Sequence, residues 1–225
     1  MYILKEYTDE NRWINHIVES IQKKVYLLKN DKSISFGLSG GNTPYPIYKN
    51  LFKIDIDWKN VNLISIDERF VSENSSYSNW IKIKESIGEK ILSKINSDIK
   101  IDYYENDIKK SISIFQKKLP DKINISILGI GEDGHFASLF PNNTYLTETT
   151  PNVIKTEAPD YLDIKERISL SSRYIMGSDY IILVLRGENK KNTLNKLFDQ
   201  DKNFKEFPAK ILLEHKNLEI HYLNI

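Results

Sequence analysis

INISILGIGEDGH, residues 123–135, is the stretch of sequence that decides the fold. Its first six residues are dominated by isoleucine and predict a buried β-strand over Ile123–Leu128. The glycines that follow allow backbone conformations that other residues rarely adopt, so the chain can turn sharply where the strand ends. A buried strand that runs directly into such a turn is typical of an α/β protein, in which ligands bind at the carboxyl ends of the strands.

Strand-like and helical patterns alternate on both sides of this stretch. Trp13, Ile17, Ile21 and Val25 recur every four positions and predict a first helix, with Thr8 as its N-cap. Further strands are expected over 2–7, 34–38, 61–66, 180–185 and 218–223, and further helices through 80–87, 108–119 and 194–197. The alternation predicts an α/β fold with a mostly parallel central sheet and helices on both of its faces.

The domain organisation follows from the continuity of this pattern. No linker, low-complexity tract or internal repeat interrupts it, so residues 1–225 are expected to form a single domain. The segment 144–166 contains Pro151 and Pro159 and lacks a clear period. We expect an irregular surface excursion there rather than a domain boundary.

Composition excludes several classes of function. The formal net charge of +1 argues against nucleic acid as a partner, because binding to a phosphate backbone needs an excess of clustered basic residues. The chain has no cysteine, which excludes disulfides and thiolate nucleophiles. The longest apolar run, Tyr180–Leu185, is far shorter than the roughly 20 residues of a membrane span, and the first residues lack the apolar core of a signal peptide. We therefore expect a soluble cytoplasmic protein that does not bind membranes.

A glycine turn follows the second expected strand. Leu38-Ser39-Gly40-Gly41-Asn42-Thr43-Pro44 leads into a predicted helix with Thr43 as N-cap and Pro44 in the first helical position. Two adjacent glycines let a ligand approach the backbone, and amides at a helix N-terminus favour an anion. The turn is therefore a candidate phosphate-binding loop, although a tight turn without a ligand explains the same residues. It matches neither common nucleotide-binding motif.

A charged corner follows the third expected strand. Asp67-Glu68-Arg69 stands where that strand ends. Arg69 is a candidate phosphate ligand or ion-pair partner, and Asp67 is a candidate to orient a base or a sugar hydroxyl. A solvated loop is the alternative for three consecutive charges. For Ser78-Asn79 we favour a role in capping the next helix over a role in catalysis.

The most informative site candidate is His135. Rigid elements would hold it at the end of a buried strand, where an imidazole can accept a proton near neutral pH. Asp133 is close enough in the sequence to hold the ring or to shape the turn, whereas a purely structural histidine remains the alternative. His16, His215 and His221 are expected to be structural or exposed. No spacing of histidines or carboxylates fits a metal site, so we predict no metal.

These turns, in this order, resemble those of the 6-phosphogluconolactonase family, which is related to the glucosamine-6-phosphate deaminases. The matching segments lie at 38–44, 67–69, 78–79, 129–141, 167–170, 187–190 and 208–209. The resemblance implies a Rossmann-like α/β/α sandwich, no cofactor and the hydrolysis of 6-phosphogluconolactone in the oxidative pentose phosphate pathway. It further implies a small sugar phosphate as the partner, and we expect a monomer or a weak homodimer.

The resemblance also assigns roles to residues of this chain. His135 is similar to the family's catalytic base, and Ser39, Gly40, Gly41, Asn42 and Thr43 are similar to its phosphate loop. Arg69 and Lys190 resemble further phosphate contacts, and Arg167 resembles an arginine near the site. Phe136, Glu132 and Tyr77 depart from the family's usual residues, and the prolines that usually precede the Arg167 motif are missing.

Two other functions remain as alternatives. A glucosamine-6-phosphate deaminase would carry a glutamate shortly after the histidine, in a stretch resembling Asn-Glu-Pro. Here that stretch is Leu139-Phe140-Pro141, and the first acidic residue after His135 is Glu148. A non-catalytic sugar-phosphate sensor would usually carry a DNA-binding or partner-binding appendage, and no helix-turn-helix extension is visible. Both observations favour the lactonase.

Overall fold

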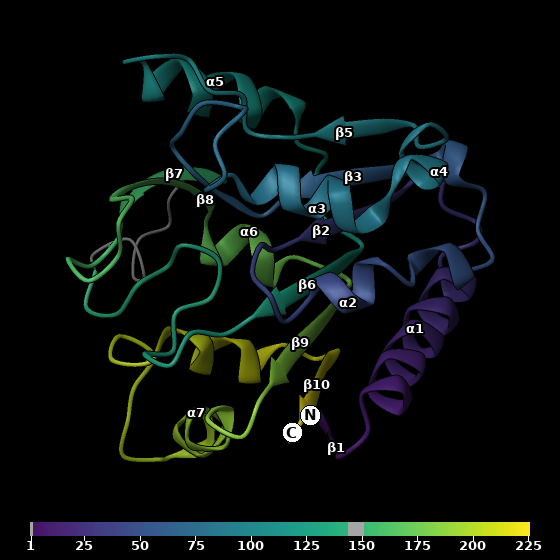
Figure 1. The fold of residues 1–225 in the computed structure, drawn as a ribbon, viewed down its shortest axis with the longest axis vertical. Coiled ribbons are helices and arrows are strands. Elements are labelled where there is room, and N and C mark those ends of the chain that lie inside the picture. Colours follow the sequence, from purple (N-terminus) through teal and green to yellow (C-terminus); the bar gives the residue numbers. More distant parts are fainter. Residues whose placement is uncertain (1, 144–150) are drawn as a thin grey trace.

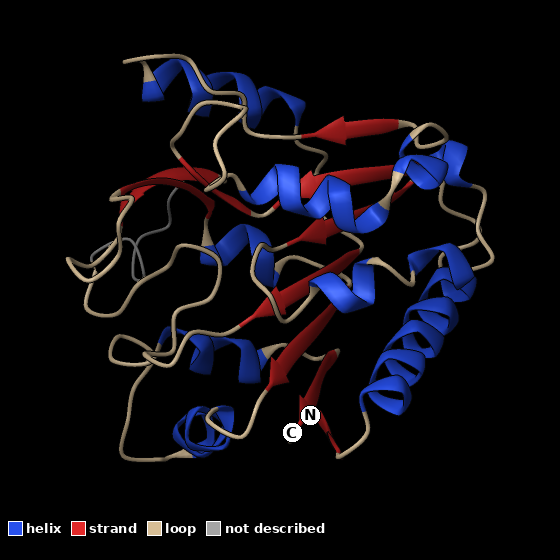
Figure 2. Cartoon of the chain, viewed as in Figure 1, coloured by secondary structure: helices blue, strands red, loops and turns tan. Residues whose placement is uncertain are grey.

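A seven-stranded parallel sheet forms the centre of the molecule. The computed structural model describes residues 2–143 and 151–225. Every neighbouring pair of strands in this sheet is parallel. The strands follow one another across the sheet in the order β1 (Ile3–Tyr7), β10 (Leu218–Leu223), β9 (Tyr180–Arg186), β6 (Ile125–Gly129), β2 (Ile34–Leu38), β3 (Val61–Ser65) and β5 (Ser97–Ile99). The predicted α/β fold with a parallel central sheet is confirmed (Figure 2).

Helices cover both faces of this sheet, because the apolar side chains of its inner strands alternate between two cores. Ile181, Leu183 and Leu185 of β9 belong to one core, whereas Ile182 and Val184 belong to the other. The first core is closed by α5 (Ile108–Lys118), α6 (Ser172–Met176), α7 (Lys190–Phe198) and the 3₁₀ helix η4 (Pro208–Glu214). The second is closed by α1 (Glu10–Leu27), α2 (Tyr45–Tyr48), α3 (Asn79–Ile87) and α4 (Glu89–Leu92) (Figure 1). The two cores make the expected three-layer sandwich in one domain.

A second, antiparallel sheet lies beside the carboxyl edge of the first. It consists of β4 (Asp67–Arg69), β8 (Glu166–Leu170) and β7 (Val153–Glu157), in that order. Two sequence interpretations are wrong here. The segment 144–166 is not irregular throughout, because Val153–Glu157 is a strand held by its pairing with β8; residues 144–150 lie outside the described part. The corner at Asp67 is not a solvated loop, since Asp67 and Glu68 are both buried.

The helix starts differ from the sequence prediction in two of three cases. Asp9, and not Thr8, caps α1 by accepting from the backbone N–H of Arg12. Pro44 occupies the N-cap position of α2 without a side-chain cap, so Thr43 does not cap this helix. Ser78 caps α3 through the N–H of Ile81, as predicted. Among the described helices, none has the length and apolar character needed to cross a membrane.

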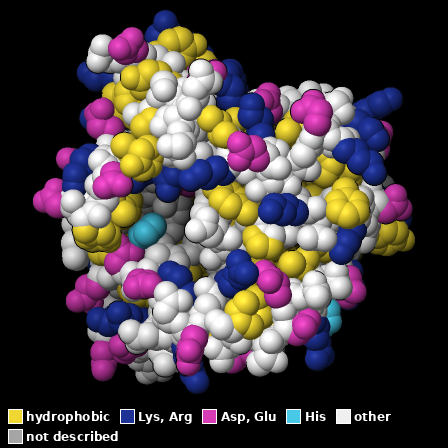
Figure 3. Space-filling model, viewed as in Figure 1, with side chains coloured by type: hydrophobic (Ala, Val, Ile, Leu, Met, Phe, Trp, Pro, Cys, Tyr) yellow, Lys and Arg dark blue, Asp and Glu magenta, His cyan; other side chains and the backbone are white. Residues whose placement is uncertain are grey.

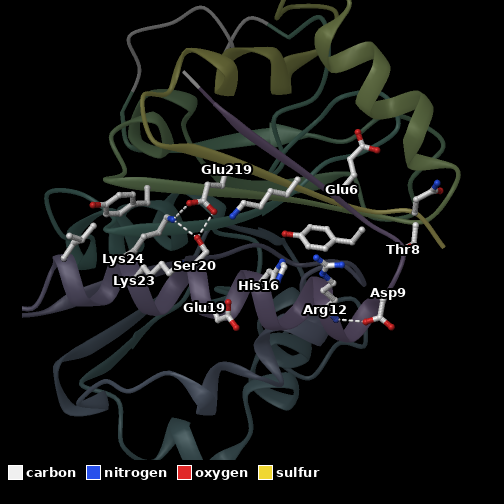
Figure 4. A pocket seen from close by; sticks show the side chains of 15 residues that line it. Glu6, Thr8, Asp9, Arg12, His16, Glu19, Ser20, Lys23, Lys24 and Glu219 are labelled. Atoms are coloured by element: carbon white, nitrogen blue, oxygen red, sulfur yellow. Dashed lines mark hydrogen bonds and ion pairs between the residues drawn. The ribbon is translucent and has the colours of Figure 1, made fainter.

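A charged groove of about 920 Å³ lies between α1 and the β1–β10 edge of the sheet (Figure 4). At its floor, Glu219 accepts hydrogen bonds from the Lys24 ammonium and from Ser20 Oγ at 2.6 Å. His221 is fully buried, with Nε2 3.1 Å from Glu219 and Nδ1 2.9 Å from the hydroxyl of Tyr7. The polar groups at the floor are therefore hydrogen-bonded to one another, and this network joins α1 to β10.

Candidate active site

A pocket of about 300 Å³ opens where β2, β3 and β6 end at the carboxyl edge of the central sheet. Figure 3 shows a hollow on one face of the molecule in which a histidine and several Lys and Arg side chains gather. Most of the predicted site residues line the pocket: Ser39, Gly40, Gly41, Thr43, Asp67, Arg69, His135, Arg167 and Lys190. These residues come from five separate segments of the chain, so only the fold brings them together in one site.

His135 and Asp133 form a hydrogen-bonded pair at this pocket. Nδ1 of His135 lies 2.6 Å from Oδ1 of Asp133, and that carboxylate also accepts from the backbone N–H of His135 at 3.1 Å. Burial alone would raise the pKa of Asp133, but the hydrogen bonds from His135 and from the hydroxyl of Tyr161 lower it to about 2. The carboxylate is thus ionised near neutral pH and favours the tautomer with hydrogen on Nδ1. Nε2 of His135 is then left with a lone pair that can accept a proton.

Glycines make room for this pair. A Cβ at Gly131 would lie 2.2 Å from Nδ1 of His135 and 2.6 Å from Oδ1 of Asp133. Gly131 also donates its N–H to the carbonyl of His135 at 2.8 Å, which closes the turn. On the other side, the ring of Phe140 packs on the imidazole with centroids 4.9 Å apart. The turn therefore fixes both the position and the orientation of the ring.

Gly134→Ala is expected to destabilise the protein by about 2 to 4 kcal/mol. Gly134 has a φ of +85°, and an added Cβ would lie 2.4 Å from the ring of the buried Phe207. Gly129→Ala is the matched control, because no heavy atom lies within 4 Å of its added Cβ. Urea unfolding of both variants measures the difference, and equal midpoints for the two would contradict the strain at Gly134.

Two arginines face the pocket from paired strands. Arg69 of β4 and Arg167 of β8 are register partners, so their side chains leave adjacent points of one sheet. Arg69 Nη1 donates to the carbonyl of Tyr77 at 2.6 Å. Arg167 is buried, and its Nε has no hydrogen-bond partner among the described residues. Burial, followed by repulsion from Arg69, lowers the pKa of Arg167 to about 10. An anion between the two guanidinium groups would relieve both penalties.

Lys190 adds a third cation to the pocket. It is the first residue of α7, and its Nζ donates to the carbonyl of Ile130 at 3.0 Å. Burial lowers its pKa, while the nearby carboxylates of Glu132 and Asp133 oppose that shift. The ammonium group is therefore tied to the histidine turn, and Lys190 lines the same pocket as Arg69 and Arg167.

The glycine turn lies against the pocket, but it differs from the predicted cradle. The helix that follows, α2, is a single turn of four residues, and the N–H of Gly41 already donates to the hydroxyl of Tyr45 at 3.1 Å. Asn42 is exposed and is the one residue of the predicted loop that does not line the pocket. Ser39 accepts from the N–H of Gly129 at 3.1 Å and so ties the turn to β6. The N–H of Gly41 and the hydroxyl of Ser39 are therefore already engaged within the protein.

Asp67 and Glu68, the two acidic residues of the charged corner, make different contacts. Asp67 lines the pocket and accepts from Ser138 Oγ at 2.7 Å, whereas the carboxylate bonded to His135 is that of Asp133. Glu68 points away and accepts from the N–H groups of Asn79 and Trp80 at 2.7 and 2.8 Å. Burial raises the pKa of Glu68, and these hydrogen bonds oppose the shift. Glu68 therefore anchors α3, whereas Asp67 is part of the pocket wall.

Sequence reasoning missed three residues of this region. Ser138 lies three positions after His135 within the same conspicuous turn, so its neighbourhood was a usable signal. Asn79 was assigned a capping role, yet its side chain lines the pocket. Tyr161 donates to Oδ2 of Asp133 at 2.8 Å, and no local pattern marked it. Among the described residues, no group of three His, Asp or Glu side chains is arranged to hold a metal ion.

Comparison with known proteins gives consistent matches over the whole chain. The family model for glucosamine-6-phosphate isomerases/6-phosphogluconolactonase matches residues 8–221. A probable 6-phosphogluconolactonase of Dictyostelium discoideum is 27% identical, over 95% of this chain and 94% of that protein. The 6-phosphogluconolactonase of Thermotoga maritima is 29% identical, over 85% and 87%. The crystal structure of a 6-phosphogluconolactonase from Shewanella baltica superposes with a TM-score of 0.89 at 21% identity, over 100% of this chain and 98% of that one.

Proposed function

The chain belongs to the glucosamine-6-phosphate isomerase/6-phosphogluconolactonase family, and from this premise we propose that it hydrolyses 6-phospho-D-glucono-1,5-lactone to 6-phospho-D-gluconate. One observation supports this reaction most directly: His135, which is hydrogen-bonded to Asp133, lines the same pocket as Arg69 and Arg167. A general base and an anion site are the two functions that hydrolysis of a phosphorylated lactone requires. The enzyme works in the cytoplasm, in the oxidative pentose phosphate pathway, without a cofactor and as a monomer or weak homodimer.

The phosphate binds at the cationic side of the pocket. Arg69, Arg167 and Lys190 supply the positive charge, and the unpartnered Nε of Arg167 is a donor in need of an acceptor. Ser39, Gly40 and Thr43 border the same space and let the phosphate approach the turn. Fixing the phosphate in this way orients the lactone carbonyl toward His135. Orientation of this kind can supply several kcal/mol of barrier reduction.

His135 acts first as base and then as acid. Nε2 takes a proton from water, and the resulting hydroxide forms a bond to C1 of the lactone. The tetrahedral intermediate collapses as the bond between C1 and the ring oxygen breaks. The imidazolium returns its proton to that oxygen, which becomes the 5-hydroxyl, and the new carboxylic acid ionises. Asp133 holds the ring and stabilises the imidazolium through the 2.6 Å contact.

Asp67 completes the site beside the base. Ser138 holds one of its carboxylate oxygens at 2.7 Å, which orients the group toward the pocket. Its position suits an acceptor for a sugar hydroxyl. General acid–base catalysis by His135 contributes roughly 10²- to 10⁴-fold, which is sufficient because lactones already hydrolyse without an enzyme.

Incubation with two substrates tests the proposal. The lactone is generated in place by oxidising glucose 6-phosphate, and acid release is followed with a pH indicator. We expect acid release well above the spontaneous rate and no ammonia from glucosamine 6-phosphate. The deaminase alternative predicts the reverse, whereas a sensor would leave both substrates unchanged and only bind sugar phosphates.

A further inference from the structure

Asn79 presents a buried amide to the candidate pocket in a fixed orientation. The residue is the first of α3 and only 2% exposed. Its backbone N–H is held by Glu68 Oε1 at 2.7 Å, and its side-chain Nδ2 donates to the carbonyl of Asp67 at 3.2 Å. Because the nitrogen end of the amide is used in this way, the oxygen end is directed away from Asp67.

That oxygen lacks a donor. Oδ1 of Asn79 is buried and has no hydrogen-bond partner among the described residues. Leaving a buried acceptor unpaired is costly, so such groups in folded proteins normally await a ligand or an ordered water. The side chain lines the pocket, which makes a ligand in that pocket the natural partner.

Gly40 lies directly against this oxygen. A Cβ at Gly40 would be 2.0 Å from Oδ1 and 2.2 Å from Cγ of Asn79, so a larger residue would have to displace the amide. The glycine turn and the start of α3 are therefore packed closely against each other where both line the pocket. The absence of a side chain at position 40 serves the placement of Asn79 as well as the approach of a ligand.

Because Oδ1 of Asn79 is an acceptor, only a hydrogen-bond donor of the ligand can pair with it. An amide oxygen accepts hydrogen bonds, and a phosphate dianion has only acceptor oxygens, so the two repel. The phosphate binds instead beside Arg69 and Arg167, whose guanidinium groups only donate. The donors of the proposed lactone substrate are the hydroxyl groups on C2, C3 and C4 of its ring, which are the chemical complement of an unpaired amide oxygen.

We propose that Asn79 is a substrate-positioning residue whose Oδ1 accepts a hydrogen bond from one ring hydroxyl of the lactone. The inference rests on the proposed function and deepens it, because it makes Asn79 a determinant of selectivity for hydroxylated sugar lactones. A site built around a hydroxyl discriminates strongly against an analogue that lacks it, since the protein's acceptor then stays unpaired.

Deoxy substrates test this pairing. Wild-type enzyme is assayed with 6-phosphogluconolactone and with the analogues lacking the hydroxyl on C2, C3 or C4, alongside Asn79→Ala. Wild type is expected to lose roughly 10- to 100-fold in kcat/KM on one analogue. Asn79→Ala should lose about as much on the parent lactone and show no further loss on that analogue. If Asn79→Ala discriminates among the analogues as wild type does, the proposal is wrong.

Two controls separate positioning from a structural role. Ser78→Ala removes the neighbouring cap and its bond to Glu68, so it should lower the melting temperature without changing the discrimination. If Asn79→Ala fails to fold, Gly40→Ala is the second variant, because it displaces the amide and should reduce the same discrimination. Unchanged discrimination in Gly40→Ala would then overturn the inference. Hydrolysis of the parent lactone by wild type tests the proposed function independently of either outcome.

Discussion

Replacing His135 with alanine is expected to lower kcat for lactone hydrolysis by roughly 10²- to 10⁴-fold. In the proposed mechanism, the variant loses the group that takes a proton from water and returns it to the ring oxygen, while the proposed phosphate ligands Arg69, Arg167 and Lys190 stay in place. The affinity for inorganic phosphate as a competitive inhibitor should therefore change little. Initial rates of acid release, corrected for spontaneous hydrolysis, give kcat, and the inhibition constant gives the phosphate affinity.

His16→Ala is the control for this experiment. His16 is half-buried on α1 and lines the charged groove, so it belongs to another part of the molecule. Its replacement should leave kcat near the wild-type value. An active His135→Ala enzyme would remove the imidazole from the mechanism. A loss of phosphate binding equal to the loss of activity would instead indicate that the turn had collapsed.

Replacing Glu219 with glutamine is expected to lower the free energy of unfolding at pH 7 by roughly 3 to 5 kcal/mol. The substitution leaves the Lys24 ammonium without its countercharge, although Lys24 is only 6% exposed. It also weakens the contacts of the carboxylate with Ser20 and His221. For a domain of this size the melting temperature should fall by roughly 6 to 20 °C, which thermal unfolding followed by circular dichroism would measure.

The same variant should show a defined dependence on pH. Burial raises the pKa of Glu219, but the hydrogen bonds from His221, Lys24 and Ser20 more than offset it and hold the pKa far below its ordinary value. A carboxylate with a depressed pKa in the folded state stabilises the fold fully above its unfolded pKa of about 4.3. This contribution declines as the pH falls further. The difference between wild type and Glu219→Gln should therefore be constant near neutrality and shrink below about pH 4.

Glu19→Gln provides the comparison within the same groove. Glu19 lines the groove too, but it is exposed on α1 (Figure 4). An exposed carboxylate contributes little, so this variant should stay within about 0.5 kcal/mol of wild type. Equal stability of the Glu19 and Glu219 variants across the pH range would show that the buried ion pair does not support the fold.

Much of the fold was predictable because its strands are marked by local composition. The six predicted strands of the central sheet are present, and the seventh, β5, has only three residues and no distinctive pattern. The antiparallel sheet was not predicted. Its strand β7 exists through pairing with β8. Strand β4 consists of three charged residues, and the burial of Asp67 and Glu68 depends on partners from elsewhere in the chain.

In the candidate site, too, some contacts could be predicted from the sequence and others could not. His135 and Asp133 are two residues apart, so a short turn was enough to suggest their contact. Arg69 and Arg167 became neighbours only through the β4–β8 register. In the predicted phosphate loop, Gly41 lines the pocket and its N–H donates to the hydroxyl of Tyr45, whereas Asn42 does not line the pocket.

The sequence by itself determined the strands of the central sheet and the turns at their ends, since each depends on neighbouring residues through backbone propensity and side-chain period. Only the tertiary structure decided which charges are buried together, as in Lys24 with Glu219, and which acceptor is left open, as in Asn79. Burial and the pairing of polar groups depend on segments distant in the chain, and no local pattern encodes them.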